Sequence, residues 1–477
     1  MNVQPRPTFS FRLRWVALLP LVLAGCTVGP NYERPAVPAS AAYKSGAPGE
    51  SVAPQLDREW WKVFHDPTLD SLEAQAVREN QTVLAAVARV AQARAVAKGV
   101  TSGVYPSLSF DPSVTRARSS GNVTPGVPSR TATATVLPFD LSYEVDIWGQ
   151  VRRAVEAANA QVLASVADAE VVLQTLEADV AQDCFTLRSY DAQYQTLTGT
   201  VASYQKQLDL TELQFHAGLE SAADVASAEA LLDATKTQQL EVGRGRDEEE
   251  FALAILLNHA PSEFSLPRQP LNLEPPVIPA GLPAELLRRR PDVAEAEANL
   301  AAASAQIGVA VSAYYPQLSL TGAAGFESIS TSNLLDASSR IWSLGPSLSL
   351  PLFNGGRLDA AVEQQKAVYD QMLAQYRGQV LTAFQDVENA LTDLHARADE
   401  ARAQDAAVKA SQDYLRLTQL QYQQGLVDYL TVVDADRTLL TNQLADEQIL
   451  NERLVSTVLL IKALGGGWEG LPPAPTR

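Results

Sequence analysis

Few side chains in this sequence could act as nucleophiles, general bases or metal ligands. The chain has two cysteines, Cys26 and Cys184, and its four histidines are too scattered to form a metal-ligand spacing. The metalloprotease pattern HExxH and the hydrolase pattern GxSxG are both absent. The residues therefore predict a protein that is not an enzyme and that has no metal or other cofactor.

Two glycine-rich stretches also fail as phosphate loops. No lysine follows Gly355-Gly356, and Gly243-Arg244-Gly245-Arg246 lies inside a helical tract, so neither fits a nucleotide site. The net charge of −18 argues against nucleic acid as a partner, because nucleic-acid binding needs a clustered basic surface. The acidity fits either simple solubility or a wet, acidic lumen that favours cations.

Cys26 stands at the end of an N-terminal leader. Three arginines precede an apolar run over residues 15–23, which is too short to span a bilayer and leads into the sequence LAGC. This resembles a lipoprotein signal, in which residues 1–25 are removed and Cys26 receives an N-acyl and an S-diacylglycerol lipid. The alternative is an ordinary secretory signal with a chance cysteine. Because Thr27 rather than aspartate follows, the resemblance implies sorting to the outer membrane.

The remaining sequence is a tandem repeat. The sequence VYPSLS at 104–109 returns as YYPQLS at 314–319, and LQFHAGL at 213–219 returns as LQYQQGL at 420–426. The offset is 210 for the first pair and 207 for the second. A proline-rich linker over 261–283 separates the two copies.

Proline punctuates each copy and predicts its elements. No proline occurs between Phe139 and Ala260 or between Leu352 and Leu471, so both tracts permit very long helices. Apolar residues recur there every three or four positions, as in a coiled coil. Each copy therefore reads helix, strand, strand, very long helix, helix. A helix over about 150–214 would be roughly 95 Å long, which suits a spacer, although a plain coiled-coil stalk has the same pattern.

The predicted strands alternate between apolar and polar residues, and this pattern bears on function. From Leu137 to Ile147 apolar side chains occupy every odd position, and about ten residues is the length of a tilted membrane strand. A soluble sheet with one buried face would alternate in the same way. The aromatic residues that gather where strands meet helices favour a membrane interface. They are Tyr105, Tyr143, Trp148, Tyr314, Tyr315 and Phe353.

Four strands leave two open edges, which lipid does not tolerate. No apolar run after Cys26 reaches the roughly 18 residues of a membrane helix, so any membrane crossing falls to these strands. A barrel must then be shared between chains, as a dimer of eight strands or a trimer of twelve. Eight strands leave an interior filled with side chains, whereas a transport duct needs a lumen.

This order of elements resembles the TolC-like outer-membrane efflux family, in its NodT or OprM-type lipoprotein branch. The resemblance covers nearly the whole mature chain. It implies a mainly α fold with a membrane β-barrel, in which a trimer forms a 12-stranded β-barrel continuous with a 12-helix coiled-coil α-barrel. The motifs that carry it are Cys26-Thr27-Val28-Gly29-Pro30-Asn31-Tyr32, Arg34-Pro35, Trp60-Trp61 with Phe64, Asp66-Pro67, Arg290-Pro291-Asp292-Val293, Tyr315-Pro316, Leu352-Phe353-Asn354-Gly355-Gly356-Arg357 and Ala463-Leu464-Gly465-Gly466-Gly467-Trp468.

Together the patterns divide the chain into six segments. These are a signal peptide (1–25), a lipid-anchored extension (26–58), the first repeat (59–260), the linker (261–283), the second repeat (284–464) and a C-terminal tail (465–477). The predicted strands are about 104–116, 131–147, 315–327 and 341–352. The predicted long helices are about 150–214, 221–258, 357–422 and 429–464.

The resemblance also implies partners and a site. It implies a homotrimer in outer-membrane lipid whose α-barrel projects into the periplasm, and docking through a membrane-fusion adaptor to an inner-membrane transporter of the RND type. Two glycines, Gly218 and Gly425, are placed to end long helices in the left-handed conformation and so to mark the periplasmic tips. The apolar residues beside them either contact the adaptor or pack inside the turn. They are Phe215, Leu219, Tyr422 and Leu426.

The tunnel mouth of this family is closed just before the second tip. Counting back from Gly425 places Leu417 at the apolar constriction. The gate aspartate of close relatives corresponds to Gln419 here, so Arg416 and Asp413 are expected to assist Leu417 instead. The predicted function is passive conduction of small molecules such as drugs out of a tripartite efflux pump. The alternatives are a duct for protein secretion of type I and a structural coiled-coil lipoprotein without a pore.

Overall fold

The computed structural model describes residues 27–37, 43–45, 57–122, 128–279 and 289–471. Cys26 and the leader lie outside these residues. The chain divides into two compact units: one contains residues 91–164 and 296–376 together with the N-terminal residues up to 35, and the other contains residues 36–90, 165–295 and 377–477. The first unit holds the β-sheet, and the second holds most of the helical hairpins.

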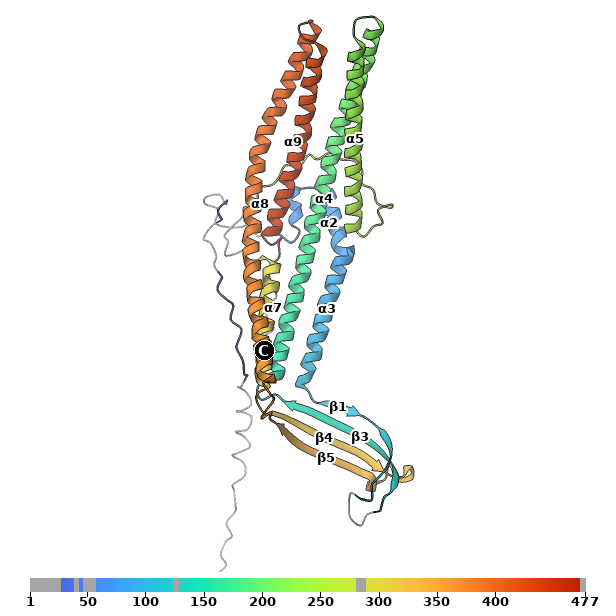
Figure 1. Ribbon diagram of the computed structural model, residues 1–477, viewed down its shortest axis with the longest axis vertical. Coiled ribbons are helices and arrows are strands. Elements are labelled where there is room, and N and C mark those ends of the chain that lie inside the picture. The colour runs from blue at the N-terminus through green and yellow to red at the C-terminus, as the bar shows by residue number, and fades with distance from the viewer. Residues whose placement is uncertain (1–26, 38–42, 46–56, 123–127, 280–288, 472–477) are drawn as a thin grey trace, which may run out of the picture. The chain divides into compact units, whose positions relative to one another are not determined.

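The long helices repeat with equal lengths. Helices α4 (Gln150–His216) and α8 (Arg357–Gln423) each have 67 residues, and α5 (Ala222–Leu256) and α9 (Tyr429–Ala463) each have 35 (Figure 1). At 1.5 Å per residue, α4 and α8 are about 100 Å long. Among the helices that the structure describes, none combines the length and the apolarity needed to cross a membrane.

Shorter helices precede each sheet segment. In the first copy these are the 3-10 helix η1 (Trp60–Phe64), α2 (Pro67–Glu79) and α3 (Gln81–Thr101), and in the second copy α7 (Pro291–Ser312). Asp66 caps α2 because its side chain accepts the backbone N–H groups of Thr68 and Leu69, and Pro67 suits the first helical position.

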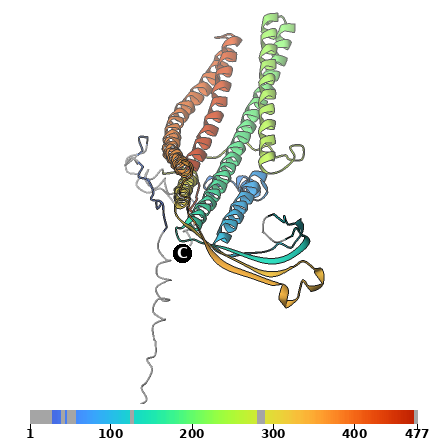
Figure 2. The same ribbon diagram turned by 60° about the horizontal axis from the view of Figure 1, so that its bottom comes forward.

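The β-sheet is a curved antiparallel ribbon in the first unit (Figure 2). Its strands are β1 (Ser107–Phe110), β2 (Ser113–Arg118), β3 (Thr131–Val145), β4 (Gln317–Ser328) and β5 (Arg340–Ser349). Their order is β1-β3-β4-β5, and β2 also pairs with β3. The two hairpin strands of the second copy are joined by a segment with the short 3-10 helices η3 (Thr331–Asn333) and η4 (Ala337–Ser339).

The first strand differs from the expected continuous strand over about 104–116. Residues Ser102–Val104 form a 3-10 helix, η2, and the strand is interrupted between β1 and β2 at Asp111-Pro112. The register against β3 is unchanged across the interruption, which lies opposite Leu137-Pro138. Two prolines therefore meet where neither can donate an N–H to the ladder. The last strand ends at Ser349 rather than near 352, because Pro351 follows.

The main core of the second unit lies where η1 and α2 meet the helical hairpins. Its buried aromatic residues are Trp60, Trp61, Phe64 and Phe185, which pack with leucines of α2, α4, α5 and α9. Cys184 belongs to this core, and burial raises the pKa of its thiol to about 12.

Candidate functional site

The two faces of the sheet are chemically different. Cross-strand pairs place Leu108 beside Leu141 and Phe110 beside Phe139, and the second pair stacks with ring centroids 4.7 Å apart. The same face continues through Ala324 to Trp342, which is 81% exposed. A row of exposed apolar side chains on one face of a sheet indicates contact with an apolar medium.

The opposite face is polar and carries only negative charges within the strands. Asp140 and Glu144 of β3 and Glu327 of β4 point to it, among serines, threonines and glycines. The arginines within the strands all occupy the apolar face, at Arg116, Arg118 and Arg340. The charges of the two faces are thus fully separated within the five described strands.

The sheet has two unpaired edges among the described residues. Strands β1 and β2 pair only with β3, and β5 pairs only with β4. Both edge strands expose large apolar side chains, with Val114 of β2 70% and Leu344 of β5 65% exposed. An apolar sheet with open backbone edges is a template for pairing with another chain.

Aromatic residues surround the junction of the sheet with its helices. Trp148 stacks on Tyr315 with ring centroids 4.7 Å apart, and its indole N–H donates to the Pro316 carbonyl at 2.9 Å. Tyr105 is 70% exposed and Phe353 is 92% exposed. Aromatic rings that are exposed, with a polar ring atom held in a hydrogen bond, are typical of the aromatic border of a membrane segment.

The two helical tips are built alike. Gly218 and Gly425 have φ values of +74° and +70°, as the sequence predicts. The N–H of Leu219 donates to the Gln214 carbonyl and that of Leu426 to the Gln421 carbonyl, each at 2.9 Å. This is the Schellman ending of a helix, and a side chain with a Cβ would be strained at either glycine.

The next helices begin with matching caps. Ser221 accepts the Asp224 N–H at the start of α5 in a full capping box, and Asp428 accepts the Thr431 N–H at the start of α9. At the tips, Leu219 and Leu426 are 76% and 68% exposed, so neither packs inside its turn. Tyr422 instead packs against Tyr429, with ring centroids 5.8 Å apart.

The expected gate residues lie on one exposed stretch of α8. Leu417 is 50% exposed and Gln419 is exposed, whereas Thr418 between them is buried. Arg416 and Asp413 form an ion pair at 3.2 Å on the same helix. The hydroxyl of Thr418 donates to the Tyr414 carbonyl of the preceding turn.

The repeat places an equivalent of Leu417 in the first copy, which the sequence analysis did not single out. Leu210 of α4 is the counterpart of Leu417 at the 207-residue offset and is 44% exposed, and Leu213 matches Leu420 in the same way. Thr211 and Thr418 are both buried. The leucine-threonine pair in each copy was visible in the sequence as part of the repeat.

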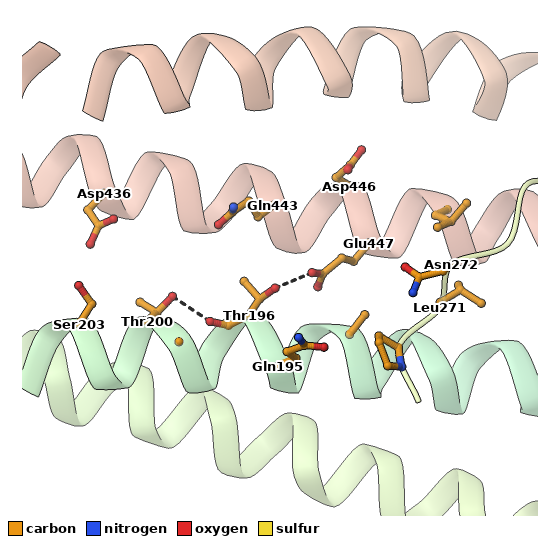
Figure 3. Close-up of a pocket in the computed structure, with 14 residues that line it drawn as sticks. Gln195, Thr196, Thr200, Ser203, Leu271, Asn272, Asp436, Gln443, Asp446 and Glu447 are labelled. Atoms are coloured by element: carbon orange, nitrogen blue, oxygen red, sulfur yellow. Dashed lines mark hydrogen bonds between the residues drawn. The ribbon is translucent and has the colours of Figure 1, made fainter. Parts of the chain in front are cut away.

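A polar groove runs between α4 and α9 (Figure 3). It encloses about 750 Å³. The Thr196 hydroxyl donates to Glu447 at 2.6 Å across it. Burial raises the pKa of Glu447, Asp446 and Asp436, and none of these carboxylates has a cation beside it within the groove lining. Groups of three or more side chains arranged to hold a metal are absent from the described ranges.

Both copies of the repeat match the same protein family. Residues 72–259 and residues 282–466 each match the family described as outer membrane efflux protein. The chain belongs to this family. Because each copy matches separately, the predicted tandem repeat is confirmed, and so is the resemblance drawn from the motifs.

Named members of the family match along nearly their full length. The toluene efflux pump outer membrane protein TtgF of Pseudomonas putida is 32% identical over 96% of this chain and 97% of its own. The outer membrane protein OprJ of Pseudomonas aeruginosa is 32% identical over 95% of each chain. The solved outer-membrane channel OprN superposes with a TM-score of 0.86 at 31% identity, covering 93% of this chain and all of that one. The predicted fold class, an α-barrel with a β-barrel, is that of these channels.

Proposed function

We propose that three copies of this chain form the outer-membrane exit channel of a tripartite efflux pump. The observation that carries the proposal is the sheet, which has one apolar face, one acidic face and two unpaired edges. In lipid an unpaired edge is not tolerated, so β5 of one copy would pair with β1 and β2 of the next. Three copies would then close a barrel around the acidic face.

A trimer fits a duct better than a dimer. Two copies would give a narrow barrel filled with side chains, whereas three copies leave room for a lumen. The same symmetry would surround a tunnel with α4, α5, α8 and α9 from each copy. This tunnel would extend into the periplasm from the helix-side end of the strands. The channel would conduct passively, since transport energy would come from the partner transporter.

The family supports our proposal for the partners and the cargo. Relatives are described as outer membrane proteins of toluene, solvent and antibiotic efflux pumps. We infer small organic compounds as cargo, a periplasmic adaptor that docks at the helical tips, and an inner-membrane transporter of the RND type. The exposed tip side chains Leu219, Leu426 and Phe215 support an adaptor contact.

We also propose a lipid anchor on Cys26, which lies outside the described residues. The LAGC sequence at the end of the apolar leader supports acylation there. Residues 27–37 would then lead from the membrane surface to the sheet unit, where the Val28 N–H donates to the Trp148 carbonyl at 3.0 Å. Arg153 holds this segment through Asn31, whose side-chain oxygen accepts at 2.7 Å.

The purified full-length chain tests the whole proposal. We expect a trimer in detergent and ion-conducting channels in planar bilayers. The subunit mass should equal that of the chain from Cys26 onward plus a lipid with three acyl chains. Because the inner face of the sheet is acidic, the channels should prefer cations. A monomer that gives no conductance would overturn the channel, whereas an unlipidated but conducting trimer would remove only the anchor.

The proposed role of Leu417 in closing the channel predicts a change in conductance. Replacing Leu417 with alanine or glycine should raise single-channel conductance, because three apolar side chains would leave the constriction at once. The same change at Leu210 should act in the same direction, since it occupies the equivalent position of the first copy. Conductance is measured for the purified variants in planar bilayers at fixed salt.

Leu381→Ala is the matched control. Leu381 is 63% exposed on α8 but lies 36 positions before Leu417, well away from the tip. This variant should conduct like the unmodified protein. If Leu417→Gly also conducts like the unmodified protein, Leu417 is not part of the gate.

A further inference from the structure

The three arginines of the strands all lie on the apolar face toward its loop-side end, two on the edge strand β2 and one on the opposite edge strand β5. Arg116 pairs across the sheet with Thr133, Arg118 with Thr131, and Arg340 with Phe326. These positions belong to the loop-side end of the strands, opposite the end that leads into α4 and α8. In the proposed trimer, Arg340 of one copy would approach Arg116 and Arg118 of the next across the seam, and we call these three residues the arginine cluster.

No internal partner accounts for the charge of this cluster. Among the described residues, no carboxylate lies within ion-pair distance of any of the three guanidinium groups, and Arg118 makes one hydrogen bond, to the Ser129 hydroxyl at 3.3 Å. The carboxylates of the strands point to the opposite face. The sequence between β2 and β3 contains no acidic residue and adds Arg130. All three arginines are exposed.

The spacing along β3 places Arg116 and Arg118 at a membrane border. Ten residues of β3 separate Tyr143, at the aromatic junction, from Thr133, the partner of Arg116. At about 3.3 Å per residue and a tilt of about 40°, that stretch spans roughly 25 Å of height, the height of the apolar band of an outer-membrane barrel. Arg116 and Arg118 would then stand just beyond the hydrocarbon, at the level of the lipid headgroups.

We infer that the arginine cluster binds the phosphate groups of an anionic glycolipid in the outer leaflet. The inference rests on the proposed orientation, in which the helices face the periplasm and the loops face the exterior. A guanidinium group presents a planar fork that matches phosphate oxygens with two parallel hydrogen bonds. In the closed barrel, β5 of one copy lies beside β2 of the next, so Arg340 would complete the site across each seam.

A lipid with sugar-linked phosphates tests this inference directly. The probe is bisphosphorylated lipid A in detergent mixed micelles, and binding to the purified trimer is followed by native mass spectrometry and by fluorescence with a labelled lipid. The triple variant R116Q/R118Q/R340Q should bind at least about tenfold more weakly, because charge-assisted hydrogen bonds to phosphate are lost. Enzymatically dephosphorylated lipid A should bind the unmodified protein as weakly as the variant binds the intact lipid.

The control removes the same charge elsewhere. Arg244, Arg397 and Arg402 are helix arginines that each lie beside a carboxylate, and R244Q/R397Q/R402Q should bind lipid A like the unmodified protein. Equal binding by the cluster variant, or equal binding of the dephosphorylated lipid, would overturn the inference. Conductance of the same preparations separates this from the proposed function: a conducting trimer with unchanged lipid binding removes only the lipid site, whereas a protein that does not conduct removes the channel.

Discussion

Replacing Asp66 with alanine is expected to destabilise the helical unit by about 4 kcal/mol. Asp66 is 4% exposed, and Arg188 donates to both of its carboxylate oxygens, one of them at 3.1 Å. The Arg188 side chain is 6% exposed, so losing Asp66 would leave a positive charge buried without its partner. The same change also removes the cap of α2, which contributes about 1 kcal/mol. The measurement is the guanidinium chloride concentration at which half of the helical signal is lost, for the purified protein in detergent.

Three further variants separate the causes. Asp66→Asn keeps the cap but not the charge, so it should retain part of the stability. The double variant D66A/R188M should recover much of the loss, because it removes both charges and fills the space. Asp399→Ala breaks an exposed ion pair with Arg402 and should change the midpoint little. If D66A matches D399A, the buried pair does not stabilise the fold.

The helices could be predicted from the sequence because their signals are local. Proline-free tracts, a 3–4 spacing and glycines at the tips predicted helices over about 150–214 and 357–422, and the observed helices are Gln150–His216 and Arg357–Gln423. Helix ends are set by caps of a few residues, as at Ser221 and Asp428. The strand alternation likewise separated the two faces of the sheet. What it missed was the interruption at Asp111-Pro112, which lies opposite Leu137-Pro138 of another strand.

Other features depend on contacts between distant segments and gave no local signal. The motif Asp66-Pro67 drew attention as part of a family resemblance, but its buried partner Arg188 lies 122 residues away. Gly465 follows the last helix, and a Cβ there would lie 2.1 Å from the Arg289 carbonyl oxygen. Glycine is required by an approach of two chain segments, which no spacing within one segment reveals.

Glu73 is the clearest case of a residue that the pattern could not predict. It lies among apolar residues of α2 and is fully buried, and neither of its carboxylate oxygens has a hydrogen-bond partner among the described residues. Burial, and then the nearby charge of Glu177, raise the pKa of Glu73 well above its ordinary value. Burial also raises the pKa of Glu177 to about 7, although the indole N–H of Trp60 donates to it at 3.0 Å.

This pair should make the stability of the helical unit fall as pH rises. Below the ordinary pKa of a glutamate, about 4.3, the folded and unfolded chains are both protonated and the group has no effect. Above it the unfolded chain ionises while Glu73 stays protonated in the core. Ionisation stabilises the unfolded chain relative to the folded one by up to about 1.36 kcal/mol per pH unit. The loss continues until the pH reaches the raised pKa of the folded state.

Glu73→Met should therefore stabilise the protein at neutral pH and flatten its pH dependence. Methionine fills similar space without an ionisable group, and the expected gain grows by up to about 1.36 kcal/mol for each pH unit above the ordinary pKa of glutamate. The measurement is the unfolding midpoint from pH 4 to pH 9, with Glu79→Gln on the same helix as control, because Glu79 is partly exposed beside Arg78. The difference between Glu73→Met and the unmodified protein should widen as pH rises and nearly vanish near pH 4. Parallel pH profiles would mean that Glu73 already finds a partner for its charge in the assembled channel.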